Sequence, residues 1–246
     1  MYNEYISKKR KGQHMGSFSY IGQNLARIRE ACLARATALG VPAPTLLAVT
    51  KSATDEEVRA LVTEFGQAAI AENRVQMFTA RYDLFDDSTR PEMHVIGSLQ
   101  TNKVKYMVDK CALLHSLDSV RLAEEIEKQA VKRDCVLPVL IEVNSGREEA
   151  KGGVLPEEAE AFAEALLAYP HIALRGIMTM APVLSSQEEY RPYFRETAGI
   201  YRRLLDRGML GDAPVLSMGM SDSYEVAIEE GATLIRVGRA LFRKDE

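Results

Sequence analysis

The stretch PVLSMGMSDSYEVAIEEGATLIRVG, residues 214–238, decides the fold. Short apolar runs at residues 214–217 and 233–237 enclose a helical pattern over residues 223–230, and each run has the length of a buried strand. Strands that alternate with helices in this way pair in parallel. The stretch therefore predicts one βαβ unit of a parallel sheet.

The same alternation extends over the rest of the chain, after a first helix predicted at residues 20–39 that ends at Gly40. A capping box formed by Thr54 and Glu57 marks the start of one helix, and Pro156 marks the first turn of another. Further strands are predicted at residues 45–50, 68–71, 93–96, 112–115, 138–143 and 173–178. Further helices are predicted at residues 54–65, 101–108, 119–132, 156–168 and 187–207.

Eight strands that alternate with helices over roughly 200 residues predict an α/β fold, a (β/α)8 TIM barrel preceded by one extra helix. An open, doubly wound sheet is the alternative, but it normally carries G-x-G-x-x-G after a strand, and no predicted strand is followed by that motif. Because we find no linker or internal repeat, residues 18–246 are expected to form a single domain. Residues 1–17, which hold a basic cluster at residues 8–11, are expected to be a flexible N-terminal extension.

The composition excludes several classes of protein. Of the 246 residues, 46% are hydrophobic and 27% are charged, with a formal net charge of -4, which is typical of a globular chain. No apolar run approaches the roughly 18 residues of a membrane span, and a slightly acidic chain has no general attraction to nucleic acid. The scattered cysteines and histidines predict no metal site and indicate a reducing, cytoplasmic location; the cysteines are Cys32, Cys111 and Cys135.

Lys51 is the first candidate for chemistry, because barrel active sites form at the carboxyl ends of strands. It follows the first predicted strand and shares a face with Leu47 and Val49. If that face points into the barrel, desolvation favours the neutral, nucleophilic amine that a Schiff-base lysine requires. The alternative is that Lys51 extends into solvent from the end of the strand.

Arg236 is the second candidate, because it lies within the last predicted strand between the apolar residues Ile235 and Val237. A buried, unpaired charge is very costly, so the guanidinium needs an acidic partner or a ligand. The sequence leaves both readings open: an ion pair with a barrel carboxylate such as Glu142, or contact with a ligand.

The loop from Ser217 to Asp222 is the third candidate, because it joins a strand to a helix and contains a glycine. Backbone N–H groups in such a loop can approach an anion, and Asp222 with Glu225 predicts a capping box for the helix. Together with the turn at Gly238, the loop matches the phosphate site that TIM barrels build after strands seven and eight. An ordinary capped loop is the alternative.

An amine, a buried cation and an anion cradle are thus predicted on one rim of the barrel. Pyridoxal 5′-phosphate (PLP) needs this combination, because it presents an aldehyde, a pyridine nitrogen and a phosphate.

Six stretches of the sequence resemble the pyridoxal phosphate homeostasis protein family, also called the proline-synthase co-transcribed homologues. They extend from the first predicted strand to the last, so the resemblance covers nearly the whole chain after residue 17. The stretches are AVTK (48–51), ENRVQ (72–76), HVIGSLQTNK (94–103), GIMTM (176–180), LSMGMSD (216–222) and IRVG (235–238).

The resemblance implies a barrel like the N-terminal domain of alanine racemase, with PLP carried on Lys51 as an internal aldimine. It implies phosphate contacts from Ser221 and from the backbone around Gly238 and Arg239, and a contact between Arg236 and the pyridine nitrogen. The full set of implied cofactor-binding residues is Lys51, Asn73 in the loop beside the ring, Met218 in the segment beneath it, Ser221, Arg236, Gly238 and Arg239.

The chain departs from the family at three positions. A glycine is usual at the position of Ala71 and at that of Arg243, and a threonine is usual at the position of Arg239. The threonine hydroxyl is therefore missing from the phosphate site. A guanidinium suits phosphate oxygens, so Arg239 can supply a charge-assisted contact in its place.

The family is described as a PLP carrier or regulator in vitamin B6 homeostasis, with no established enzymatic activity. Arg236 agrees with that description, because a guanidinium accepts no proton and so leaves the pyridine nitrogen unprotonated and the ring a poor electron sink. We therefore expect a PLP-binding protein without robust catalysis. The expected recipients of PLP are PLP-dependent apo-enzymes or free amino acids, and the chain is expected to be a monomer.

Two other functions stay open at this point. The first is a single-domain, PLP-dependent amino acid racemase, although such racemases use a second acid/base, a tyrosine from a C-terminal β-domain, and this sequence ends shortly after the last predicted strand. The second is a barrel that binds a phosphorylated metabolite without a cofactor, through Arg236 and the loop at residues 217–221. Lys103 and Lys151 are interpreted as surface lysines rather than as secondary PLP contacts.

Overall fold

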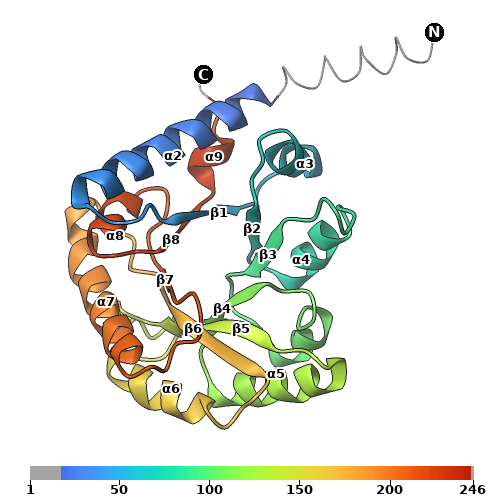
Figure 1. Cartoon of the computed structure of the whole chain (residues 1–246), viewed down its shortest axis with the longest axis vertical. Helices are drawn as coiled ribbons and strands as arrows, with labels where there is room; N and C mark the ends of the chain where they lie inside the picture. The colour runs from blue at the N-terminus through green and yellow to red at the C-terminus, as the bar shows by residue number, and fades with distance from the viewer. Residues whose placement is uncertain (1–17, 245–246) are drawn as a thin grey trace.

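The computed structural model describes residues 18–244, so the predicted N-terminal extension and its basic cluster lie outside the described residues. Eight parallel strands form a closed barrel in chain order, with the last strand paired to the first (Figure 1). The predicted (β/α)8 barrel is confirmed, and the open sheet is excluded. The strands are β1 (Thr45–Val49), β2 (Ala69–Glu72), β3 (Glu92–Val95), β4 (Leu113–Leu117), β5 (Leu137–Val143), β6 (Ile172–Thr179), β7 (Val215–Ser217) and β8 (Leu234–Val237).

Helices surround the barrel, and the predicted extra helix precedes β1 (Figure 1). This helix ends at Gly40, whose φ of 69° is the left-handed conformation that a glycine adopts at low cost. The helices are α2 (Ser19–Leu39), α3 (Asp55–Thr63), α4 (Val75–Tyr82), α5 (Val120–Arg133), α6 (Ala159–Leu166), α7 (Arg191–Asp206), α8 (Tyr224–Glu229) and α9 (Arg239–Phe242). Three segments are 3₁₀ helices: η1 (Thr101–Tyr106), η2 (Pro156–Glu158) and η3 (Glu188–Tyr190).

Most of the helices were predicted from the sequence, and two short ones were not. The predicted capping box opens α3, where the Glu57 N–H donates to Thr54 Oγ1 at 3.2 Å and the Thr54 N–H donates to Glu57 Oε2 at 2.8 Å. The short helices α4, with eight residues, and α9, with four, were not predicted. Residues 101–106 form a 3₁₀ helix rather than the predicted α-helix.

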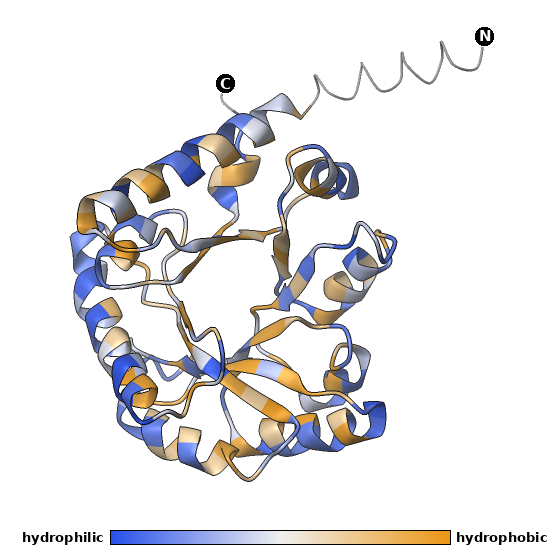
Figure 2. Ribbon diagram, in the orientation of Figure 1, coloured by the Kyte–Doolittle hydropathy of each residue, from blue (hydrophilic) through white to orange (hydrophobic). Residues whose placement is uncertain are grey.

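The strands bury apolar residues on both of their faces, as the strands of a parallel barrel must. Their outer faces pack against the helices in one large core that includes Ile70, Leu114 and Ile235. Their inner faces form small clusters such as Leu47 with Leu234. Figure 2 shows hydrophobic colour along much of the strands and mixed colour along the helices. Burial of each large aliphatic side chain contributes about 1.5–3 kcal/mol to folding.

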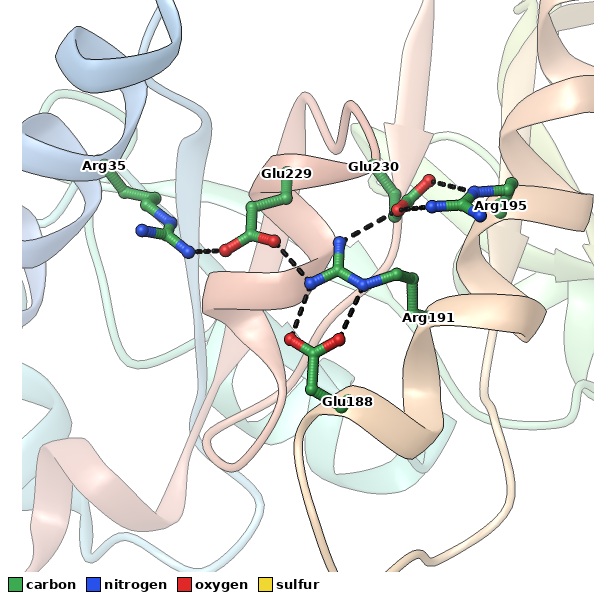
Figure 3. A network of polar contacts seen from close by, with 6 residues as sticks. All are labelled: Arg35, Glu188, Arg191, Arg195, Glu229 and Glu230. Carbon is green, nitrogen blue, oxygen red and sulfur yellow. Dashed lines mark hydrogen bonds and ion pairs between the residues drawn. The ribbon is translucent and has the colours of Figure 1, made fainter.

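An ion-pair network ties the extra helix to the last helices of the barrel (Figure 3). Arg191 of α7 pairs with Glu229 of α8 at 2.6 Å and with Glu230 at 3.0 Å, and Arg35 of α2 also pairs with Glu229. Near the other end of α2, Asn24 Nδ2 donates to the carbonyl oxygen of Arg243 at 2.8 Å. Helix α2 therefore holds the segment that follows β8. No helix in the described part of the chain is long and apolar enough to cross a membrane.

Candidate functional site

A cavity of about 320 Å³ opens at the carboxyl ends of the strands, where TIM barrels place their sites. Its volume lies at the lower end of the range for small-molecule sites. Its walls come from β1 and β8 and from the segments that follow β1, β2, β3, β6, β7 and β8. The predicted cofactor-binding residues among its lining are Lys51, Asn73, Ser221, Arg236, Gly238 and Arg239.

Lys51 lies in the turn after β1, on the rim of this cavity. The strand ends at Val49, one residue earlier than predicted, so Lys51 stands beyond the sheet. Its side chain is exposed, and the expectation of an amine in a water-poor interior is wrong in this structure. The amine instead has access both to the cavity and to solvent.

A buried polar cluster fixes the turn that carries Lys51. Thr50 Oγ1 donates to Glu72 Oε1 at 2.6 Å, and Arg81 Nε lies 3.5 Å from the same oxygen. Arg81 also donates to the carbonyl oxygen of Ala53 at 2.5 Å, on the other side of the lysine. Burial raises the pKa of Glu72, while the hydrogen bond from Thr50 and the charge of Arg81 lower it. Sequence reasoning missed this cluster, although Glu72 opens the quoted ENRVQ stretch.

Arg236 is 4% exposed and lines the floor of the cavity. Its guanidinium donates to Ser217 Oγ at 2.7 Å and to the carbonyl oxygen of Thr179 at 2.8 Å. No carboxylate of residues 18–244 forms an ion pair with it, so the alternative of an ion pair with Glu142 is wrong. Burial lowers the pKa of Arg236 to about 10 and the charge of Glu142 opposes that shift, so a charged guanidinium faces the cavity at neutral pH.

The loop after β7 presents Ser221 to the cavity. The loop turns at Gly219 with a φ of 89°, and a Cβ there would lie 2.5 Å from Ala227 Cβ, so only glycine fits. Ser221 Oγ accepts a weak hydrogen bond of 3.5 Å from the N–H of Ala240, just after Gly238. The loops after β7 and β8 therefore meet at one place, as the phosphate-site prediction requires.

Asp222 does not cap a helix, and the predicted capping box with Glu225 is wrong. Helix α8 begins at Tyr224, and the residue before it, Ser223, makes no side-chain cap. Asp222 instead forms an exposed ion pair with Arg239. The guanidinium of Arg239, which was expected to contact the phosphate in place of the usual threonine, is therefore paired with Asp222.

Asn73 and Met218 differ in their positions. Asn73 lines the cavity, and its Oδ1 atom is buried with no hydrogen-bond partner in the described residues. Its loop approaches the segment after β3 so closely that a Cβ at Gly97 would lie 2.3 Å from the Asn73 carbonyl oxygen. Met218 is fully buried in the core and does not line the cavity, whereas Met180 and Met220 do.

The two other lysines singled out in the sequence lie outside this cavity. Lys103 lines a neighbouring cavity of about 310 Å³, which shares Asn73 and Ser98 with the first. Lys151 pairs with Glu148 at 2.7 Å. Within residues 18–244, no group of three or more His, Cys, Asp or Glu side chains could hold a metal ion.

The donor set of the rim cavity fits PLP. The amine of Lys51 can react with an aldehyde, and the buried Arg236 supplies a cation for a polar ring atom. The hydroxyl of Ser221 and the adjoining turn at Gly238 supply donors for a phosphate. The unpartnered Asn73 Oδ1 is an acceptor that a ligand can satisfy.

Comparison with known proteins identifies the class first. Residues 23–245 match the family model for the alanine racemase N-terminal domain. The closed barrel and its rim cavity agree with this class.

Similar proteins and solved structures then identify the family within this class. The chain is 43% identical over 228 residues to the pyridoxal phosphate homeostasis protein of Aquifex aeolicus, covering 93% of this chain and 98% of that protein. A solved structure of an unknown protein from Bifidobacterium adolescentis is 32% identical, with a TM-score of 0.84 over 91% of this chain and 95% of the other. PipY of Synechococcus elongatus, solved with PLP bound, is 28% identical, with a TM-score of 0.77 over 91% of this chain and 100% of the other. The chain belongs to the pyridoxal phosphate homeostasis protein family.

Proposed function

We propose that this chain binds PLP in the rim cavity, holds it covalently through Lys51 and takes part in PLP homeostasis. The observation that carries the proposal is that Lys51, Ser221 and Arg236 line one cavity, although they come from opposite ends of the chain. The PLP that PipY holds on the same fold supports the choice of cofactor.

When bound, PLP supplies an aldehyde that condenses with amines and a ring that withdraws electrons. Lys51 provides the attachment point for the aldehyde. Its exposed position on the rim gives a second amine, from solvent or from a partner protein, access to the same group. An open rim favours exchange of the cofactor over its sequestration. This geometry suits a carrier that takes up PLP and passes it on.

Arg236 limits the chemistry at the ring. Its guanidinium only donates hydrogen bonds, so a pyridine nitrogen beside it stays unprotonated. The ring is therefore a poor electron sink. Racemases of the alanine racemase type also tolerate an arginine at this position, so the proposal of a carrier without robust catalysis rests as well on the second acid/base that such racemases need opposite the lysine. Arg236 instead binds and orients the ring.

Ser221 and the backbone around Gly238 and Arg239 are proposed to hold the phosphate. The side chain of Arg239 becomes available to the phosphate when it leaves Asp222, and their ion pair is exposed and therefore weak. In this arrangement the guanidinium of Arg239 takes the place of the usual threonine hydroxyl.

We further propose that residues 18–246 act as one monomeric domain in the cytoplasm. The free cysteines Cys32, Cys111 and Cys135 are consistent with a reducing compartment. The proposed recipients of PLP are PLP-dependent apo-enzymes or free amino acids, because both offer the amine that exchange requires.

The visible spectrum of the purified protein tests the proposed function. After addition of PLP and removal of the excess, the protein is expected to be yellow, and sodium borohydride is expected to fix one pyridoxyl group that peptide mass spectrometry places on Lys51. A protein that stays colourless contradicts the proposal and favours binding of a phosphorylated metabolite. Incubation with single L-amino acids, followed by chiral chromatography, distinguishes a carrier from a racemase, since rapid racemisation of any one of them contradicts the carrier.

A further inference from the structure

We propose that His115 and His94 are positioning residues, which act through Ser217 to hold the guanidinium of Arg236 in one hydrogen-bonded orientation. The proposal concerns side chains inside the barrel, beneath the rim cavity. Its consequence for PLP rests on the proposed function, whereas the hydrogen-bond arrangement itself does not.

The four side chains form one continuous line across the barrel interior. Arg236 of β8 donates to Ser217 Oγ of β7 at 2.7 Å, and Ser217 Oγ lies 3.1 Å from His115 Nδ1 of β4. His115 Nε2 lies 3.0 Å from His94 Nδ1 of β3. His115 is 0% exposed and His94 is 5% exposed, so water does not compete for these bonds.

The groups at the two ends of the line, Arg236 and Glu92, favour one direction for its hydrogen bonds. A guanidinium only donates, so Ser217 Oγ accepts from it and is left with its own hydrogen to donate to His115 Nδ1. His115 then carries its hydrogen on Nε2 and donates it to His94 Nδ1. In the reverse direction Ser217 Oγ would accept from His115 Nδ1 as well, and His94 Nε2 would be an unprotonated acceptor facing the carboxylate of Glu92. Two acceptors that face each other repel, so the first direction is favoured.

The far end of the line agrees with this direction. With Nδ1 acting as an acceptor, His94 keeps its own hydrogen on Nε2, which has no hydrogen-bond partner in the described residues. Glu92 Oε2 lies 3.8 Å from that nitrogen, at the amino end of β3. Burial, together with the nearby His94 and Arg236, lowers the pKa of His115 well below its ordinary value, so His115 stays neutral as the line requires.

Removal of His115 would leave Ser217 without its acceptor. The hydroxyl could then rotate, and Arg236 would keep only the carbonyl oxygen of Thr179 as a fixed partner. Because Arg236 lines the cavity, a looser guanidinium weakens whatever ring contact it makes there. This places His115 and His94 among the residues that shape the site without touching the ligand.

A long-range proton–nitrogen NMR spectrum of the PLP-free protein tests the arrangement directly. Both imidazoles are expected in the Nε2–H form, with their signals assigned by their loss in His115→Asn and His94→Asn. A His115 that carries its hydrogen on Nδ1 would overturn the proposal. This measurement stands even if the protein binds no PLP, so failure of the proposed function and failure of this inference are distinguishable.

Two variants of one residue test the positioning role. His115→Phe removes the acceptor, whereas the amide oxygen of His115→Asn can take the place of Nδ1. We expect His115→Phe to broaden or shift the guanidinium signals of Arg236 and to weaken PLP retention about tenfold, the effect of one buried hydrogen bond to a charged network. His115→Asn is expected to keep the Arg236 signals and PLP retention close to those of the wild type. Unchanged Arg236 signals in His115→Phe, or equal loss of retention in the two folded variants, would overturn the proposal.

Discussion

Thr50 Oγ1 donates a hydrogen bond of 2.6 Å to Glu72 Oε1 immediately beside Lys51 in the chain. Arg81 contacts the same carboxylate and reaches past it to the carbonyl oxygen of Ala53. The turn that carries the amine is therefore held on both sides by a buried acid and base, rather than by regular secondary structure.

The first prediction concerns the stability of this turn. Arg81→Met leaves Glu72 buried without its cation, so the free energy of unfolding in urea is expected to fall by about 3 kcal/mol. Arg59→Ala removes an exposed arginine from the neighbouring helix and is expected to change it by less than about 0.5 kcal/mol. Equal stability of Arg81→Met and wild type would show that the turn does not depend on the pair.

The second prediction concerns the attachment point. Lys51→Ala is expected to abolish the borohydride-fixed pyridoxyl group while leaving the circular dichroism spectrum unchanged, because the side chain is exposed and supports no core contact. Lys103→Ala, which removes a lysine from the neighbouring cavity, is the matched control and should retain the group. A fixed group at an unaltered site in Lys51→Ala would mean that another lysine carries PLP.

The third prediction concerns the cradle. Ser221→Ala and Arg236→Ala are each expected to weaken PLP retention about tenfold without removing the reactivity of Lys51, because each deletes a donor that lines the cavity. Equilibrium dialysis gives the retention, and borohydride fixation at saturating PLP gives the reactivity. Wild-type retention in both variants would contradict the proposed cradle.

The fourth prediction concerns the ion pair that holds Arg239 away from the site. Asp222→Asn removes a negative charge near the proposed phosphate position and frees the guanidinium, so PLP retention is expected to tighten about threefold. Asp212→Asn makes the same charge change before β7, at the other end of the barrel, and should leave retention unchanged. Weaker binding in Asp222→Asn would mean that the carboxylate helps to build the site.

The fifth prediction concerns pH. Burial, reinforced by Asp118, raises the pKa of Glu142 from 4.5 to about 7. Between these values the native protein holds a proton that the unfolded chain releases, so this group's contribution to stability falls as the pH rises through the window, by on the order of 3 kcal/mol. Glu142→Gln is expected to remove that slope in urea titrations at pH 5 and pH 8. A slope that persists in Glu142→Gln would assign it to other groups.

The strands were predictable because each is a short apolar run bounded by turns, and each of the eight predicted runs overlaps an observed strand. The candidate residues at the strand ends were predictable for the same reason, since the carboxyl ends of parallel strands share one rim. The exposure of Lys51 was not predictable, because it depends on the residue at which β1 ends. The hydrogen-bonded line through His115 was not predictable either, since its partners His94 and Ser217 lie 21 and 102 positions away along the chain. The sequence also left two interpretations of Arg236 open, an ion pair with Glu142 or contact with a ligand. Only the geometry of the barrel excludes the ion pair.

The pairing of β8 with β1 has a consequence for how the protein matures. Leu47 lies opposite Arg236 in that pairing, so the turn bearing the amine and the two turns proposed to grip the phosphate become neighbours only when the ring closes. The ribosome synthesises the turn that carries Lys51 before the turns that follow β7 and β8. PLP would therefore be retained only after β8 has paired with β1, and retention of the cofactor would report closure of the barrel.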